Sequence, residues 1–173
     1  NTMRIIRRWA MPNPETFKIK PIAELLKRHI TEGDVVVDPF ARNSKVGTWT
    51  NDLNPATTAD YHMRAEEFCE MLVRANIAAD KTLFDPPYSV HQAKLCYEGI
   101  GFHLGQREAQ VLFADVKDQL SKLLRPGGLA ISFGWNSTGF GKMRGFERVE
   151  TMLVCHGRAH YDTIVVVERK IIA

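Results

Sequence analysis

The chain has 173 residues, of which 45% are hydrophobic and 25% charged, a balance typical of a soluble globular protein. No apolar run approaches the ~20 residues of a membrane span, which excludes a membrane-spanning chain. The net charge of +3 is compatible with a nucleic-acid partner but does not require one. Three scattered cysteines form neither a disulfide framework nor a zinc-ligand pattern, so we expect no metal and a reducing cytosol.

The first part of the chain predicts one helix and three short strands. Apolar residues at helical spacing behind Pro21 predict an amphipathic helix that has proline in its first turn and stops at Gly33. Short apolar runs predict strands at 35–38, 48–52 and 59–63.

Helix and strand signals continue to alternate in the rest of the chain. Helices are predicted at 65–76 and 107–124, with a strand at 82–84 between them and a Pro-Gly-Gly stop after the second. The remaining expected elements are a strand at 129–133, a loop at 134–145, and two antiparallel strands at 147–155 and 161–168.

This order is typical of an α/β protein with a mostly parallel sheet, which the late hairpin makes a mixed sheet. A parallel crossover usually needs about a dozen or more residues and contains a helix. Asp38 and Asp52, which end the first two predicted strands, leave barely that much room. We therefore predict a shortened first crossover, within a single domain that covers 1–173 and has no separate target-recognition domain.

The candidate catalytic residues of the chain lie in one tetrapeptide. An apolar strand runs into Asp85-Pro86-Pro87-Tyr88, and open α/β sheets bind ligands at the carboxyl ends of their strands. The two prolines fix φ and remove two N–H donors, which leaves carbonyls, a carboxylate and a ring. Such a group accepts hydrogen bonds and stacks on a flat molecule, so it suits an amino group on an aromatic base.

The predicted reaction is direct methylation of that amino nitrogen. The lone pair of an adenine amino group is delocalised into the ring, and Asp85 and the Pro86 carbonyl can accept its two hydrogens and favour a more pyramidal nitrogen. This nitrogen can attack a sulfonium methyl group without a metal or a covalent intermediate, and positioning supplies most of the rate gain. Tyr88 would stack on the base, which must be flipped out of a duplex or be single-stranded.

The order and spacing of the motifs resemble the amino-methyltransferase group of class I S-adenosylmethionine (SAM)-dependent enzymes, in particular small phage-type adenine-specific (N6) DNA methyltransferases. The resemblance covers nearly the whole chain. It implies a three-layer Rossmann-like fold, SAM as cofactor, and site-specific methylation of adenine in DNA. The tetrapeptide matches the family's catalytic motif, which assigns catalytic roles to Asp85, Pro86, Pro87 and Tyr88.

The resemblance also implies cofactor residues. The segment 37–40 matches the first cofactor motif, whose acid and aromatic residue lie near the methionine part of SAM. Asp52 takes the place of the acid that accepts hydrogen bonds from the ribose hydroxyls, and 17–21 resembles the motif that covers the methionine end. The residues expected to bind SAM are Phe17, Lys18, Asp38, Pro39, Phe40, Ala41, Asp52 and Leu53.

Recognition of the target is expected to come from loops. The segment 160–163 resembles a motif near the target base, and cations in the loops 89–105 and 137–148 can bind phosphates. The expected nucleic-acid-binding residues are His91, Lys94, Lys142, Arg144, His160 and Tyr161. DNA is the expected partner, and a homodimer or a partner protein would extend the recognition surface. The expected location is the cytosol of a bacterium or of a phage-infected host.

Two alternatives stay open. The same tetrapeptide serves amino methylation of adenine or guanine in RNA. A degenerate methyltransferase fold that only binds nucleic acid or a partner is favoured by the turn at 41–44, which lacks the family's glycines, although Asn43 tolerates a left-handed conformation. Methylation at C5 of cytosine is excluded because it requires a cysteine nucleophile, typically after proline, and the chain has no Pro-Cys pair.

Overall fold

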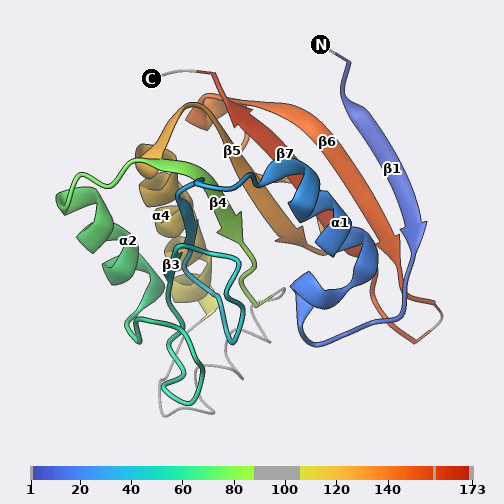
Figure 1. Ribbon diagram of the computed structural model, residues 1–173, viewed down its shortest axis with the longest axis horizontal. Helices are drawn as coiled ribbons and strands as arrows, with labels where there is room; N and C mark the ends of the chain where they lie inside the picture. The colour runs from blue at the N-terminus through green and yellow to red at the C-terminus, as the bar shows by residue number, and fades with distance from the viewer. Residues whose placement is uncertain (1, 88–105, 158, 172–173) are drawn as a thin grey trace.

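A computed structural model of the chain describes residues 2–87, 106–157 and 159–171 (Figure 1). The strands are β1 (Arg4–Trp9), β2 (Val36–Asp38), β3 (Trp49–Thr50), β4 (Ala79–Phe84), β5 (Leu124–Gly134), β6 (Phe146–Cys155) and β7 (Thr163–Lys170). The α-helices are α1 (Lys20–His29), α2 (Ala65–Arg74) and α4 (Gln106–Leu123), and the 3₁₀ turns are η1 (Thr16–Lys18) and η2 (Lys142–Arg144).

Within this described part, seven strands form one mixed sheet in the order β1-β6-β7-β5-β4-β2-β3. The strand β7 pairs antiparallel with both of its neighbours, and the other neighbouring strands pair in parallel. The predicted α/β fold with a mostly parallel sheet and a C-terminal antiparallel hairpin is therefore confirmed.

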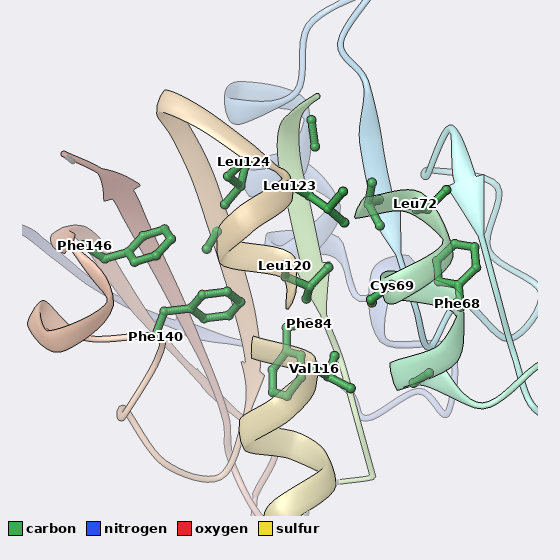
Figure 2. Close-up of a cluster of buried hydrophobic side chains, with 14 residues drawn as sticks. Phe68, Cys69, Leu72, Phe84, Val116, Leu120, Leu123, Leu124, Phe140 and Phe146 are labelled. Carbon is green, nitrogen blue, oxygen red and sulfur yellow. The ribbon is translucent and has the colours of Figure 1, made fainter. Parts of the chain in front are cut away.

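Two helical layers cover the sheet, which makes three layers in all (Figure 1). Successive side chains of β5 point to opposite faces of the sheet and pack under different helices. Leu129, Ile131 and Phe133 belong to the cluster under α1, whereas Ala130 belongs to the cluster under α2 and α4. Figure 2 shows this second cluster, where Phe84 of β4 meets side chains of α4. None of the described helices has the length and apolar character to cross a membrane.

The helix α1 begins as predicted but ends early. Pro21 occupies its first turn, and the apolar face at helical spacing is buried against the sheet. The predicted stop at Gly33 is wrong, since the helix ends at His29. The Thr31 N–H donates to Asp34 Oδ2 (2.9 Å), and the Asp34 N–H donates to the Thr31 carbonyl (3.1 Å). These local bonds compete with continuation of the helix.

The first crossover is short, as predicted. Between β2 and β3 the chain forms turns without a helix, and Gly47 packs so closely that a Cβ there would lie 3.0 Å from Asp38 Cβ. The predicted strand at 59–63 is reduced to one isolated parallel bridge between Asn51 and Tyr61. A two-residue β3 offers little backbone for a further strand to pair with.

The edge strand β1 was not predicted from the sequence. Only Ile6 of its six residues is buried, so no apolar alternation marks it. It forms because it pairs in parallel with β6. In the register of this pairing, Arg4 lies opposite Glu150. This pairing joins segments at opposite ends of the chain, and no local pattern reports it.

A buried ion-pair cluster fixes β1 and α1 to β6. Glu150 is 1% exposed and accepts from both Arg28 Nη atoms at 2.8 and 3.2 Å, while His29 Nε2 lies 2.7 Å and Arg4 Nε 3.9 Å away. Burial alone would raise the pKa of Glu150, but the hydrogen bonds from Arg28 and His29 outweigh it, and the pKa lies below its usual value.

Glu150→Gln is expected to destabilise the protein by about 1.5–3 kcal/mol at neutral pH, the range for charge-assisted hydrogen bonds. Because the folded-state pKa is depressed, the contribution of Glu150 is present above its unfolded pKa and is lost as pH falls through the folded value. Urea unfolding from pH 7 to pH 3 should show the variant and the wild type converging in acid. Glu147→Gln, which breaks a more exposed pair with Arg169, is the matched control; equal losses in both variants would contradict the prediction.

Candidate active site

The carboxyl ends of the parallel strands lie at one edge of the sheet (Figure 1). The neighbours β2 and β4 form a topological switch point, because the chain continues from β2 to β3 on one side and from β4 to β5 on the other. Ligands of α/β sheets bind at such points. Asp38 ends β2 and Asp85 directly follows β4, so the topology brings two buried carboxyl groups to this point.

A cavity of about 580 Å³ opens here between the turn at 40–46 and the segment 14–18; we call it the turn cavity. Its volume is within the range of small-molecule sites. The predicted site residues that line it are Phe17, Lys18, Phe40, Ala41 and Asp85. Asp38, Pro39, Asp52 and Leu53 were also predicted to bind a cofactor but are not among its described lining residues. Asp38 and Asp52 accept hydrogen bonds from the N–H groups of the lining residues Phe40 and Arg42, and Pro39 precedes Phe40, whereas Leu53 packs against the hydrophobic core.

The turn after β2 folds without glycine. The Arg42 N–H donates to Asp52 Oδ2 at 2.9 Å, so one role of Asp52 is to hold this turn. Arg42 has φ of +52°, in the region that favours glycine. The residue with this conformation is therefore Arg42 and not Asn43, which was expected to tolerate it. Asn43 Oδ1 accepts from the Thr58 N–H at 2.9 Å and fixes the following loop instead.

Asn51 connects the strand ends behind the turn cavity. Its Nδ2 donates to the Pro39 carbonyl (3.2 Å) and the Met63 carbonyl (2.9 Å), and its Oδ1 accepts from the Met63 N–H (3.0 Å). The buried Asn51 amide therefore joins the end of β2 to the segment before α2. This role was not predicted from the sequence.

Asp38 has one carboxylate oxygen without a partner. Oδ1 accepts from the Phe40 N–H at 3.2 Å, while Oδ2 is buried and makes no hydrogen bond within the described residues. Burial raises the pKa of Asp38 well above its usual range, and the nearby Asp85 carboxylate raises it further. A donor or cation from a ligand would stabilise the ionised form.

Arg42 supplies the positive charge beside Asp85. Its Nη1 lies 3.4 Å from Asp85 Oδ2, 3.3 Å from the Pro14 carbonyl and 3.5 Å from Thr16 Oγ1. The Asp85 side chain is 3% exposed and that of Arg42 is 43% exposed. The guanidinium therefore faces a buried carboxylate while it remains accessible to solvent and to ligands.

A second cavity of about 650 Å³ lies between the segment 12–19 and the β6–β7 hairpin; we call it the hairpin cavity. The predicted site residues that line it are Pro87, His160 and Tyr161. Trp135, which directly follows β5, also lines it, and its ring centroid lies 4.4 Å from that of Tyr161. Aromatic side chains at a cavity wall are suited to contact with a flat base.

The two cavities share a wall. Pro14, Thr16 and Arg42 line both of them, and Asp85 lines the turn cavity beside Arg42. A ligand in the turn cavity and another in the hairpin cavity would therefore approach each other next to the Asp85 carboxylate.

His156 fixes one side of the hairpin cavity. Its Nδ1 lies 2.9 Å from the Ala10 carbonyl and its Nε2 lies 2.9 Å from Thr163 Oγ1. The imidazole thus links the end of β1 to the hairpin. Sequence analysis placed His156 only in a connecting loop, because its partners are distant in sequence.

The other predicted site residues are not among the described lining residues of the two cavities. Tyr88, His91 and Lys94 lie outside the described residues. Pro86 is buried and lines a small cavity of about 170 Å³. Lys142 and Arg144 form η2, which precedes β6 and therefore lies at the opposite edge of the sheet (Figure 1). Arg144 there pairs with Asp118 at 2.6 Å, away from both cavities.

Comparison with solved structures identifies the fold. The chain is similar to TrmN from Thermus thermophilus, with a TM-score of 0.56 and 18% identity over 88% of this chain and 49% of that chain. It is also similar to SMU.776, a candidate methyltransferase complexed with SAH (TM-score 0.61, 13% identity, 86% of this chain and 48% of that chain). A candidate SAM-dependent methyltransferase from Streptococcus mutans gives a TM-score of 0.57 at 14% identity, over 86% of this chain and 48% of that chain.

These similarities define the class of fold, which is the Rossmann-like α/β fold of SAM-dependent methyltransferases. The chain spans about half the length of these structures. No family model and no curated protein matches the sequence.

Proposed function

We propose that the protein transfers the methyl group of SAM to the N6 amino group of adenine in DNA. The observation that carries this proposal is the position of Asp85: the buried carboxylate of the Asp-Pro-Pro motif lines the turn cavity and lies 3.4 Å from Arg42, which lines both cavities. One cavity would hold the cofactor and the other the target base.

The turn cavity and the residues that adjoin it would hold SAM. Phe17 and Phe40 offer apolar walls, and the buried Asp38 Oδ2 without a partner calls for a donor or a cation of the kind that the methionine end of SAM carries. Asp52 stands beside the turn and would accept from the ribose hydroxyls with its remaining lone pairs. The likeness to a structure complexed with SAH supports this assignment.

The residues around Asp85 would prepare the amino group for transfer. The Asp85 carboxylate and the Pro86 carbonyl accept its hydrogens, which holds the nitrogen lone pair toward the turn cavity. When bound, SAM would supply a methyl group on a positively charged sulfur: the bond from N6 to the methyl carbon would form as the sulfur–carbon bond breaks, SAH would leave, and one N6 proton would pass to solvent. That Tyr88 stacks on the base stays a prediction.

The hairpin cavity would hold a base that has left its stack. A duplex hides the amino nitrogen, so the target nucleotide must be flipped out or already unpaired. Trp135 and Tyr161 offer ring surfaces to the base or its neighbour, and His160 lies in the same wall. DNA is proposed over RNA because the sequence motifs resemble adenine-specific DNA methyltransferases.

The proposal is tested by offering the purified protein SAM with a labelled methyl group, together with unmethylated genomic DNA or total RNA in parallel reactions. Mass analysis of the nucleosides should find labelled N6-methyladenine in DNA. Label in RNA alone would keep the chemistry and correct the substrate. Absence of label in both, with SAM bound at micromolar concentration, would contradict the proposal.

A further inference from the structure

The shared wall of the two cavities carries a donor directly beside an acceptor. Arg42 Nη1 and Asp85 Oδ2 lie 3.4 Å apart. Within the described residues, the hydrogen bonds of the Arg42 side chain all use Nη1, which leaves Nη2 and Nε as further donors. Arg42 lines both cavities, and its side chain is 43% exposed, so the guanidinium is open to a ligand.

An acceptor and a donor side by side match the edge of adenine. The N6 amino group donates, and the ring nitrogen next to it accepts. Asn and Gln read adenine in DNA through the same arrangement, one acceptor and one donor that bind together. Enzymes that flip a base read it through its Watson–Crick edge, where N1 is the ring nitrogen beside N6.

We propose that Arg42 is a recognition residue that donates a hydrogen bond to N1 of the target adenine while Asp85 accepts from N6. This inference rests on the proposed function and specifies how its site selects the base. The contact holds the Watson–Crick edge of the base against the shared wall. It also favours a base whose amino group adjoins an unprotonated ring nitrogen.

The backbone allows this assignment to be tested without strain. Arg42 has φ of +52°, which glycine adopts readily, and Asp52 holds the turn through the backbone N–H of residue 42. Arg42→Gly therefore removes the guanidinium and keeps the turn. Arg42→Lys keeps a cationic donor at the same position.

The experiment measures single-turnover methyl transfer to oligonucleotides that carry adenine, 1-deazaadenine or 7-deazaadenine at the methylated site. The wild type should prefer adenine over 1-deazaadenine, and Arg42→Gly should reduce this preference by about tenfold or more, since a good bidentate base contact contributes about 1–3 kcal/mol of discrimination. The preference over 7-deazaadenine should not change, and Arg42→Lys should restore part of the lost preference. Each preference is a ratio from one preparation, so the fraction of folded protein cancels.

An unchanged preference for adenine over 1-deazaadenine in Arg42→Gly would overturn the inference. A change that appears only with 7-deazaadenine would overturn it as well, because Arg42 would then read N7. A wild type that transfers no methyl group to adenine would contradict the proposed function itself, which distinguishes that failure from a failure of Arg42 alone.

Discussion

Asp85→Ala is expected to lower the rate of methyl transfer by about 10²–10³-fold, the usual effect of removing one preorganised polar contact to the reacting group. The reason is that Asp85 is the buried carboxylate in the wall of the turn cavity, beside Arg42, which lines both cavities. The other carboxylate among the described lining residues, that of Glu15, is exposed and pairs with Lys18. Single-turnover transfer of labelled methyl to DNA measures the effect under saturating SAM.

Asp85→Asn is the matched variant for this test. The amide keeps one oxygen that accepts from an amino group, so it should retain more activity than alanine. Thermal unfolding should show that both variants fold, because the partly exposed Arg42 returns to water when its partner is removed. An alanine variant with undiminished transfer would contradict the role of Asp85 in the reaction.

Asp38→Asn is expected to weaken binding of SAM by about 10- to 100-fold, because a hydrogen bond to a charged group contributes about 1.5–3 kcal/mol. The carboxylate oxygen without a partner is the feature that a cationic donor on the cofactor would satisfy. Isothermal titration with SAM and with SAH measures the loss. Wild-type affinity in the variant would contradict the assignment of Asp38 to the cofactor site.

The same substitution should stabilise the ligand-free protein. Because burial and Asp85 raise the folded-state pKa of Asp38, ionising it costs stability as pH rises from its unfolded pKa through the folded value. The gain of Asp38→Asn should therefore grow as pH increases, by about 2–4 °C in Tm for each kcal/mol removed. Asp118→Asn, a surface pair at the other edge of the sheet, is the control and should show neither effect. A variant less stable than the wild type at pH 8 would contradict this expectation.

Local sequence patterns were sufficient for the elements that have their own periodicity. The buried faces of α1, α2 and α4 and the hairpin of β6 and β7 repeat apolar residues at the spacing that each element requires. The prolines that follow β4 likewise mark the end of that strand. These features were predicted because one stretch of chain contains all the information about them.

Local sequence patterns do not predict the strand β1 or the end of α1. A mostly exposed edge strand has no apolar alternation, so its pairing with β6 is invisible until the fold places them together. The helix α1 ends where Thr31 and Asp34 bond to each other, rather than at the glycine that usually marks a helix end.

The sequence by itself determined the alternation of strands and helices after β1, the mixed sheet, the short first crossover and the Asp-Pro-Pro motif at a strand end, because each depends on neighbouring residues. The tertiary structure decided that Arg42 lies beside Asp85, that two cavities share one wall, and that Lys142 lies at the opposite edge. The physical reason is the parallel sheet: it brings strand ends that are far apart in sequence to one edge, and only the direction and order of the strands determine which loops meet there.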